Sequence, residues 1–147
     1  MSQHHWYVNI DLLRQRGEEI RRATSLLARH ASIPMNEFVA DQTIVDAAKY
    51  RLLVAIEAAI SICTHLSARL AGKAPAIYAQ CFQELVTAGI ITQELGGRLE
   101  RMARFRNLLV HVYGEVDDNR VWEILQSNLQ DLDTYLSSVG EAIKDQI

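Results

Sequence analysis

Residues 41–72, DQTIVDAAKYRLLVAIEAAISICTHLSARLAG, carry an apolar pattern that indicates the class of fold. The apolar side chains that recur there at spacings of three and four residues are Ile44, Ala48, Leu52, Ala55, Ile56, Ala59, Ile62 and Leu66. That spacing places them on one face of an α-helix, whereas a strand would show strict alternation. Asp41 is suited to cap the helix, which we expect to reach Leu70 and to stop at Gly72. The stretch therefore predicts a long buried helix in an all-α fold.

A first helix is predicted before this stretch, because the same spacing is seen at Ile10, Leu13, Ile20, Leu26 and Leu27. Pro34 should end it, since proline disfavours the helical conformation at the residue before it. The segment 35–40 is then expected to be a short turn that leads into Asp41.

Two more helices are predicted next along the chain. The first covers about residues 76–88, with Pro75 in its first turn and Gly89 as its stop. The second is capped by Thr92 and runs to about Tyr113.

Glycines interrupt and end this fourth helix. Gly96 and Gly97 weaken it near its start, and Gly114 closes it. We therefore expect that these glycines could loosen the helix.

A last helix is predicted after Asp117 or Asp118, either of which can cap it. Its apolar residues are Val121, Ile124, Leu125, Leu129, Leu132, Leu136, Val139 and Ile143. The sequence thus predicts an all-α bundle of four main helices and one shorter helix, in one domain over residues 1–147.

The charge is distributed unevenly along a chain of 147 residues that is 49% hydrophobic and 22% charged. The net charge of -3 gives no overall attraction to nucleic acid, so binding to a polyanion requires a local basic patch. Arg98, Arg101, Arg104 and Arg106 form such a patch within nine residues, against the single acid Glu100.

The two cysteines, Cys63 and Cys81, lie in apolar helical patterns without a CxxC pair or a secretion signal. Reduced thiols in the core are therefore expected instead of a disulfide. No stretch of 18 uninterrupted apolar residues is present, so we expect a soluble cytoplasmic protein that does not enter a membrane.

The segment RFRNLLVHVY, residues 104–113, combines an apolar stripe with polar side chains. On an ideal helix Phe105, Leu108, Leu109 and Val112 share one face, which we expect to be core. A second, polar line contains Glu100, Arg104, Asn107 and His111, at spacings of four, three and four. This arrangement predicts that Asn107 reaches His111.

Arg106 does not belong to that polar line. It points about 140° away from His111 and aligns with Tyr113 instead. The long arginine side chain wrapping round the helix, a deformed helix, or a second copy of the chain would each bring the two together. We favour a dimer, because a twofold axis near this helix doubles the polar groups in one cleft.

The types of side chain at Arg106 and His111 suit the cleavage of a phosphodiester. Histidine, with an unperturbed pKa of about 6.5, transfers protons near neutral pH, and arginine offers a planar fork of donors to phosphate oxygens. RNA supplies its own nucleophile, the 2′-hydroxyl, and no carboxylate cluster lies beside the motif, so a route without a metal is favoured. From spacing alone, a solvated face, a core histidine and a packed Tyr113 ring remain the alternatives.

The string of Arg106, four residues, His111, one residue and Tyr113 resembles the RX4HXY signature of the HepT family of HEPN-domain ribonuclease toxins. The resemblance extends over about residues 40–140 in the order and spacing of the helices. It implies a HEPN four-helix bundle that forms a homodimer, with Arg106 and His111 of both protomers in a shared cleft that cuts RNA without a metal. Asn107 would support this site.

The resemblance also implies a partner, an MNT-type nucleotidyltransferase antitoxin that attaches AMP to Tyr113 and so silences the toxin. The alternative is a catalytically silent HEPN module that binds such a partner. The cluster makes Arg101 and Arg104 candidates for RNA binding, while tRNA and mRNA both remain open as substrates.

No cofactor or metal is expected. His4, His5, His30 and His65 show no metal-ligand spacing, and only His65 is considered as a neighbour of the cleft.

Overall fold

The computed structural model of the protein describes residues 7–72 and 77–146, without the side chain of Tyr113. Within these ranges the chain is all-α and contains no strand, as predicted. The elements, in order, are α1 (Ile10–Ala31), α2 (Met35–Ala40), α3 (Gln42–Ala71), α4 (Tyr78–Thr87), α5 (Gln93–His111), the short 3-10 segment η1 (Tyr113–Glu115), α6 (Asp118–Ser127), α7 (Leu129–Ile143) and the 3-10 segment η2 (Lys144–Gln146).

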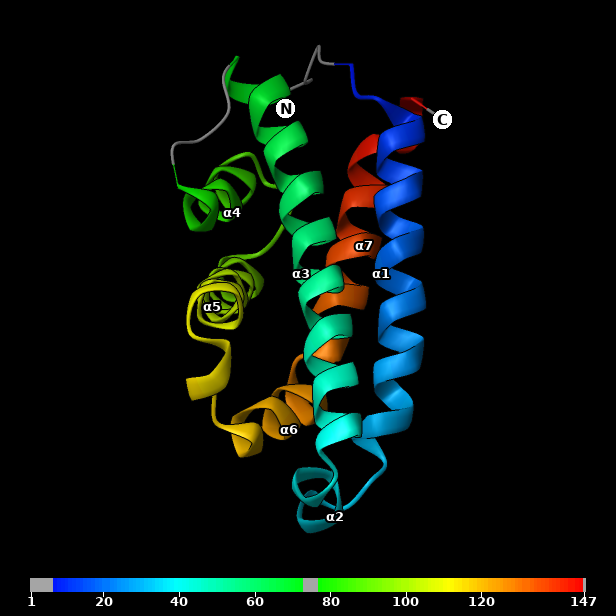
Figure 1. The fold of residues 1–147 in the computed structure, drawn as a ribbon. Coiled ribbons are helices and arrows are strands. Elements are labelled where there is room, and N and C mark those ends of the chain that lie inside the picture. Colours follow the sequence, from blue (N-terminus) through cyan, green and yellow to red (C-terminus); the bar gives the residue numbers. More distant parts are fainter. Residues whose placement is uncertain (1–6, 73–76, 147) are drawn as a thin grey trace.

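The long helix α3 is the centre of the bundle (Figure 1). α1 and α7 pack on one side of it, α4 and α5 lie on the other, and α2 and α6 close the end opposite the two termini. By length and composition alone α3 could also cross a membrane, but the same composition is expected of a helix at the centre of a bundle.

The core joins α3, α4 and α7. The hydroxyl of the fully buried Tyr135 donates to the carbonyl of Ala59 at 2.9 Å, and its ring meets Phe82 edge to face at 5.8 Å. Burial raises the pKa of the Tyr135 hydroxyl, so it remains a donor. Cys63 and Cys81 are buried here as free thiols, as predicted.

Local signals predicted most helix ends correctly. The Asp41 carboxylate accepts from the backbone N–H of Thr43 at 3.1 Å, and the Thr92 hydroxyl accepts from that of Leu95 at 3.2 Å. Asp117, one of the two candidates, caps α6. Gly72 and Gly89 have φ of 80° and 79°, a left-handed conformation that favours glycine after a helix.

Three boundaries differ from the prediction. Residues 35–40 form the helix α2 and not a turn, because burial of Phe38 holds this short segment against the bundle. α4 begins at Tyr78 and ends at Thr87, while the predicted role of Pro75 lies outside the described residues. α5 ends at His111, two residues early.

The predicted last helix is divided in two at Asn128. The indole N–H of Trp122 donates to the carbonyl of Ile33 at 2.8 Å, and the Gln126 amide donates to that of Ala31 at 2.7 Å. These contacts hold α6 across the end of α1, so the chain must turn before α7 can run back along the bundle (Figure 1).

Candidate active site on α5

Arg106 is held from three sides. Its Nε donates to the Glu57 carboxylate on α3, and its Nη1 donates to Oδ1 of Asn107 at 3.0 Å. The guanidinium also lies over the ring of Tyr78 on α4, 5.8 Å from the centroid. With only 20% of its side chain exposed, Arg106 is fixed between α3, α4 and α5.

Glu57 also belongs to this site, although it was not predicted from the sequence. It is the only acid between Asp46 and Ala71, in the middle of the apolar pattern of α3. A lone carboxylate in such an apolar run indicates a specific contact, because the charged group requires either solvent or a cationic partner. Its side chain is 45% exposed, and its partner Arg106 is 49 residues away in the sequence.

His111 is exposed at the last position of α5. Arg106 does not wrap round to it, and α5 is an unbroken helix between the two residues. The expected pair of Asn107 and His111 is not formed, and the Asn107 carbonyl oxygen accepts from Arg106. One protomer therefore places the arginine and the histidine of the motif on different faces of the helix.

Tyr113 opens η1, two residues after His111. Its backbone is close to the site along the chain, but its side chain lies outside the described residues. The roles predicted for this phenol are therefore taken up below as proposals.

The arginines of the predicted cluster have two kinds of environment, since Arg98 is held in ion pairs and Arg101 and Arg104 are exposed. Arg98 binds Asp131 of α7 at 3.2 Å and Glu94 at 2.8 Å, so it connects helices. Arg101 and Arg104 are exposed, and Arg104 is 3.8 Å from Glu100.

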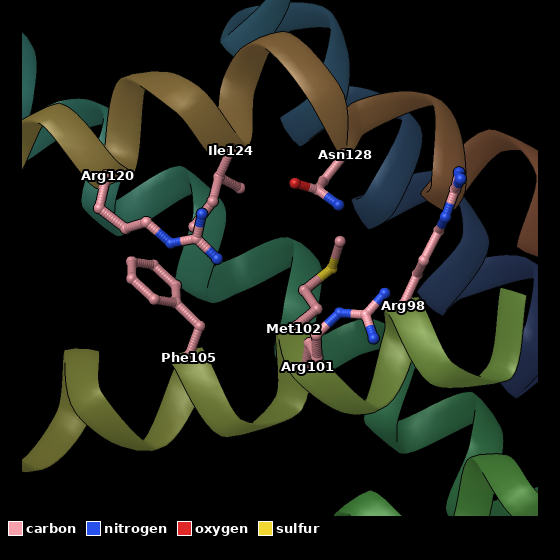
Figure 2. Close-up of a pocket in the computed structure, with 7 residues that line it drawn as sticks. All are labelled: Arg98, Arg101, Met102, Phe105, Arg120, Ile124 and Asn128. Atoms are coloured by element: carbon pink, nitrogen blue, oxygen red, sulfur yellow. The ribbon is translucent and has the colours of Figure 1, made fainter. Parts of the chain in front are cut away.

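Arg120 on α6 joins the exposed arginines, although it is 14 residues beyond the cluster in the sequence. Figure 2 shows Arg101 and Arg120 extending from α5 and α6 toward the same small pocket of about 40 Å³, with Phe105 and Met102 beside them. Tertiary packing alone brings Arg120 there.

The apolar stripe of α5 is only partly core. Phe105 and Leu109 are buried as predicted, but Leu108 is 50% exposed. It lines a groove of about 500 Å³ between α5 and the segment that leads into α6. The prediction that Leu108 belongs to the core is wrong, because no helix of the described residues covers this side of α5 at that level.

His65 lies away from these residues. Its Nε2 accepts from the backbone N–H of Asn9 at 2.9 Å, at the start of α1. Partial burial, together with the charge of Arg69, lowers its pKa, which suits a neutral ring that accepts a hydrogen bond. The alternative that His65 neighbours the cleft is therefore wrong. Within the described residues, no group of three His, Cys, Asp or Glu side chains is placed to hold a metal.

Curated relatives share the sequence at moderate identity. An mRNA nuclease HepT of Shewanella oneidensis is 28% identical over 104 residues, which are 71% of this chain and 78% of that protein. A tRNA nuclease HepT of Aphanizomenon flos-aquae is 25% identical over 131 residues, which are 88% of each.

Solved structures share the fold. A tri-AMPylated HEPN toxin of Shewanella oneidensis in complex with an MNT antitoxin superposes with a TM-score of 0.81 at 24% identity, covering 89% of this chain and 98% of that one. YutE of Bacillus subtilis, a cytosolic protein of unknown function, has a TM-score of 0.80 at 13% identity, covering 97% and 95%.

Residues 18–139 match the model of the family described as HepT-like, Ribonuclease HepT-like. This match spans five of the helices completely and includes the Arg106, His111 and Tyr113 motif. It confirms the resemblance seen in the sequence and the expected HEPN-type bundle. The chain belongs to the ribonuclease HepT-like family.

Proposed function

We propose that the protein is the toxin of a toxin–antitoxin system, a cytoplasmic endoribonuclease that cuts cellular tRNA or mRNA without a metal. Arg106 and His111 are its catalytic residues, in a cleft shared by two protomers, with Asn107 as support. The observation that carries the proposal is the ribonuclease family match over residues 18–139, which contain the whole motif. The relatives named as mRNA and tRNA nucleases support both kinds of substrate.

The reaction is an attack of the RNA 2′-hydroxyl on the adjacent phosphorus. His111 takes the proton of the 2′-hydroxyl as the O2′–P bond forms, and a water molecule gives a proton to the 5′-oxygen as the P–O5′ bond breaks. Arg106 donates to the non-bridging oxygens, where negative charge accumulates. The products are a 2′,3′-cyclic phosphate and a 5′-hydroxyl.

The dimer is supported by the geometry of one protomer. Arg106 is bound back toward α3, whereas His111 is at the end of α5 on another face. Ile77, Tyr78 and Val110 expose apolar side chains on α5 and at the start of α4, next to the candidate site. A second copy that covers this surface would add its own Arg106 and His111 to the cleft.

The test of the proposed function is cleavage of RNA by the purified protein in EDTA. We expect cyclic phosphate ends from the wild type and loss of cleavage in His111→Ala and Arg106→Ala, with unchanged helical circular dichroism. His30→Ala, on α1, is the matched control and should cleave normally. Full cleavage by both site variants would contradict the proposal, and absence of cleavage by the wild type would favour the silent interaction module.

Tyr113 is the proposed site of silencing by an MNT-type nucleotidyltransferase antitoxin. The solved HEPN toxin that is tri-AMPylated and bound to such an antitoxin supports this regulation. AMP adds negative charge and bulk two residues from His111, which should exclude RNA.

Co-expression with the antitoxin should raise the intact mass by one or more AMP residues and suppress cleavage. Tyr113→Phe should abolish the added mass, whereas the control Tyr50→Phe, at an exposed tyrosine of α3, should keep it. Added mass that persists in Tyr113→Phe would refute the assignment.

A further inference from the structure

The groove between α5 and α6 has the size of a ligand site. Its volume of about 500 Å³ lies in the range of roughly 300–1,000 Å³ that small-molecule sites occupy. Arg101, Arg104 and Arg120 line it together with an apolar surface that includes Phe105 and Leu108. Arginines beside an apolar floor suit a nucleotide, since a nucleotide has a flat base and an anionic phosphate.

The three arginines are available to bind an anion, because none of them forms a short ion pair with a described residue. Arg101 forms no ion pair with any described residue, and the contacts of Arg104 with Glu100 at 3.8 Å and of Arg120 with Glu123 at 3.6 Å are long. Arg104 and Arg120 are also more than half exposed, so these surface pairs contribute little. In a chain of net charge -3, this groove therefore concentrates positive charge.

The apolar surface of the groove is exposed where a core was expected. Leu108 is half exposed, and Phe105 lies beneath it on the same side of α5. A base that covers Leu108 would remove apolar area from water without any movement of the helices.

Two acids also line the groove. Glu115 and Asp117 line it, and Asp117 also caps α6. Carboxylates repel phosphate but accept hydrogen bonds from ribose hydroxyls and base amino groups. The groove thus offers arginines to the phosphate and carboxylates to the neutral parts of a nucleotide.

The groove is continuous with the candidate active site through Arg104. Arg104 and His111 are seven residues apart on α5, so their side chains differ by only about 20° around the helix. Arg104 also lines the groove. A chain that runs from His111 across Arg104 enters the groove directly.

We propose that this groove is the binding subsite for a nucleotide of the substrate RNA next to the one that is cut. The base covers Leu108 and Phe105, and its phosphate lies between Arg101 and Arg120. The inference rests on the proposed function for its substrate, but the residues that carry it are different from Arg106 and His111. Arg120 is a binding residue from α6, outside the motif.

The test measures binding separately from cleavage. In a His111→Ala background, the affinity of the full-length protein for a single-stranded RNA oligonucleotide is measured by fluorescence anisotropy at several salt concentrations. Arg120→Ala should weaken binding about tenfold, as expected for one charged contact, and should flatten the salt dependence by about one phosphate contact. Arg120→Lys should retain much of the affinity, and Leu108→Asp should lose it.

Arg22→Ala, an exposed arginine on α1, is the matched control and should bind as the parent does. Equal affinity of Arg120→Ala and Arg22→Ala would overturn the subsite while leaving cleavage by the wild type, and hence the proposed function, intact. A change of oligomeric state in Arg120→Ala or Leu108→Asp, measured by sedimentation, would also overturn it, because the groove would then be a contact between copies. Cleavage by His111→Ala at the wild-type rate would instead refute the proposed function.

Discussion

At the scale of single residues, Glu57 is the side chain outside the motif that has the most direct contact with the Arg106 guanidinium. It accepts from Nε of Arg106, while Asn107 accepts from Nη1. These contacts occupy the Nε and Nη1 donors, and Nη2 donates to no described residue. Glu57 is thus a positioning residue for Arg106, since the carboxylate itself would repel the substrate.

Removing Glu57 should therefore lower the rate of cleavage more than the affinity. We expect Glu57→Ala to reduce kcat between tenfold and a hundredfold with little change of KM, because a misplaced arginine stabilises the transition state poorly. Glu57→Gln, which keeps an acceptor, should recover part of kcat. Stability should hardly change, since partly exposed ion pairs contribute about 0–1 kcal/mol. Glu18→Ala on α1 is the control, and wild-type kcat in Glu57→Ala would remove this role.

The sequence marks Arg106 and His111 as the candidates for the chemistry, but it does not show how their side chains are held. Arg106 and His111 are recognisable from a motif within one helix. Glu57, Tyr78 and Arg120 take part through packing between helices, which spacing along the chain does not encode. The same reason explains why Asn107 was assigned to His111 when it contacts Arg106.

At the scale of helices, the ends that were predicted correctly depend on local chemistry. A cap such as Asp41 or Thr92 bonds to N–H groups two or three residues ahead, so its signal is contained in the sequence nearby. The division at Asn128 depends instead on Trp122 reaching Ile33, 89 residues away. A continuous apolar pattern gives no sign of such a turn.

The two glycines at the start of α5 also differ in their packing against other residues, although both were predicted to weaken the helix. A Cβ on Gly96 would lie 2.4 Å from Cγ2 of Val86 on α4, whereas one on Gly97 would lie 3.9 Å from Nη1 of Arg101. Gly96 therefore allows α4 and α5 to approach closely, and only Gly97 leaves room for a side chain.

We expect Gly96→Ala and Gly97→Ala to change stability in opposite directions. Gly96→Ala should lower the free energy of unfolding by about 1–3 kcal/mol, the usual effect of overpacking. Gly97→Ala should raise it by about 0.5–1 kcal/mol, because alanine is the better helix former. Urea denaturation followed by circular dichroism measures both. Because α4 carries Tyr78 against Arg106, only Gly96→Ala should also reduce cleavage, and equal effects of the two changes would contradict this account.

At the scale of the whole molecule, the bundle presents Arg106 and His111 on different faces of one rigid helix. α5 is held on both sides, by α4 near Gly96 and by α7 through the ion pair of Arg98 with Asp131. A large rotation of α5 would break these contacts, so closing the gap within one chain would be costly. A second protomer, as proposed above, would bring the missing group to each site without such a change.

This arrangement predicts that two inactive variants restore cleavage when they are mixed. Dimers of Arg106→Ala retain both histidines and no arginine, and dimers of His111→Ala retain the reverse, so each should be inactive alone. A mixed dimer has one arginine and one histidine of the motif in the shared cleft. Random exchange makes about half of the dimers mixed, so the cleavage activity of the mixture should return to well below half of the wild-type activity. Differently tagged subunits, co-expressed and purified through both tags, establish that the mixed dimer is the species assayed. Mixing Arg106→Ala with the double variant, which lacks both groups, is the control and should give no return. If the doubly tagged dimer is formed but inactive, each protomer must complete its own site, and Arg106 would then have to leave Glu57 to reach the histidine of its own helix.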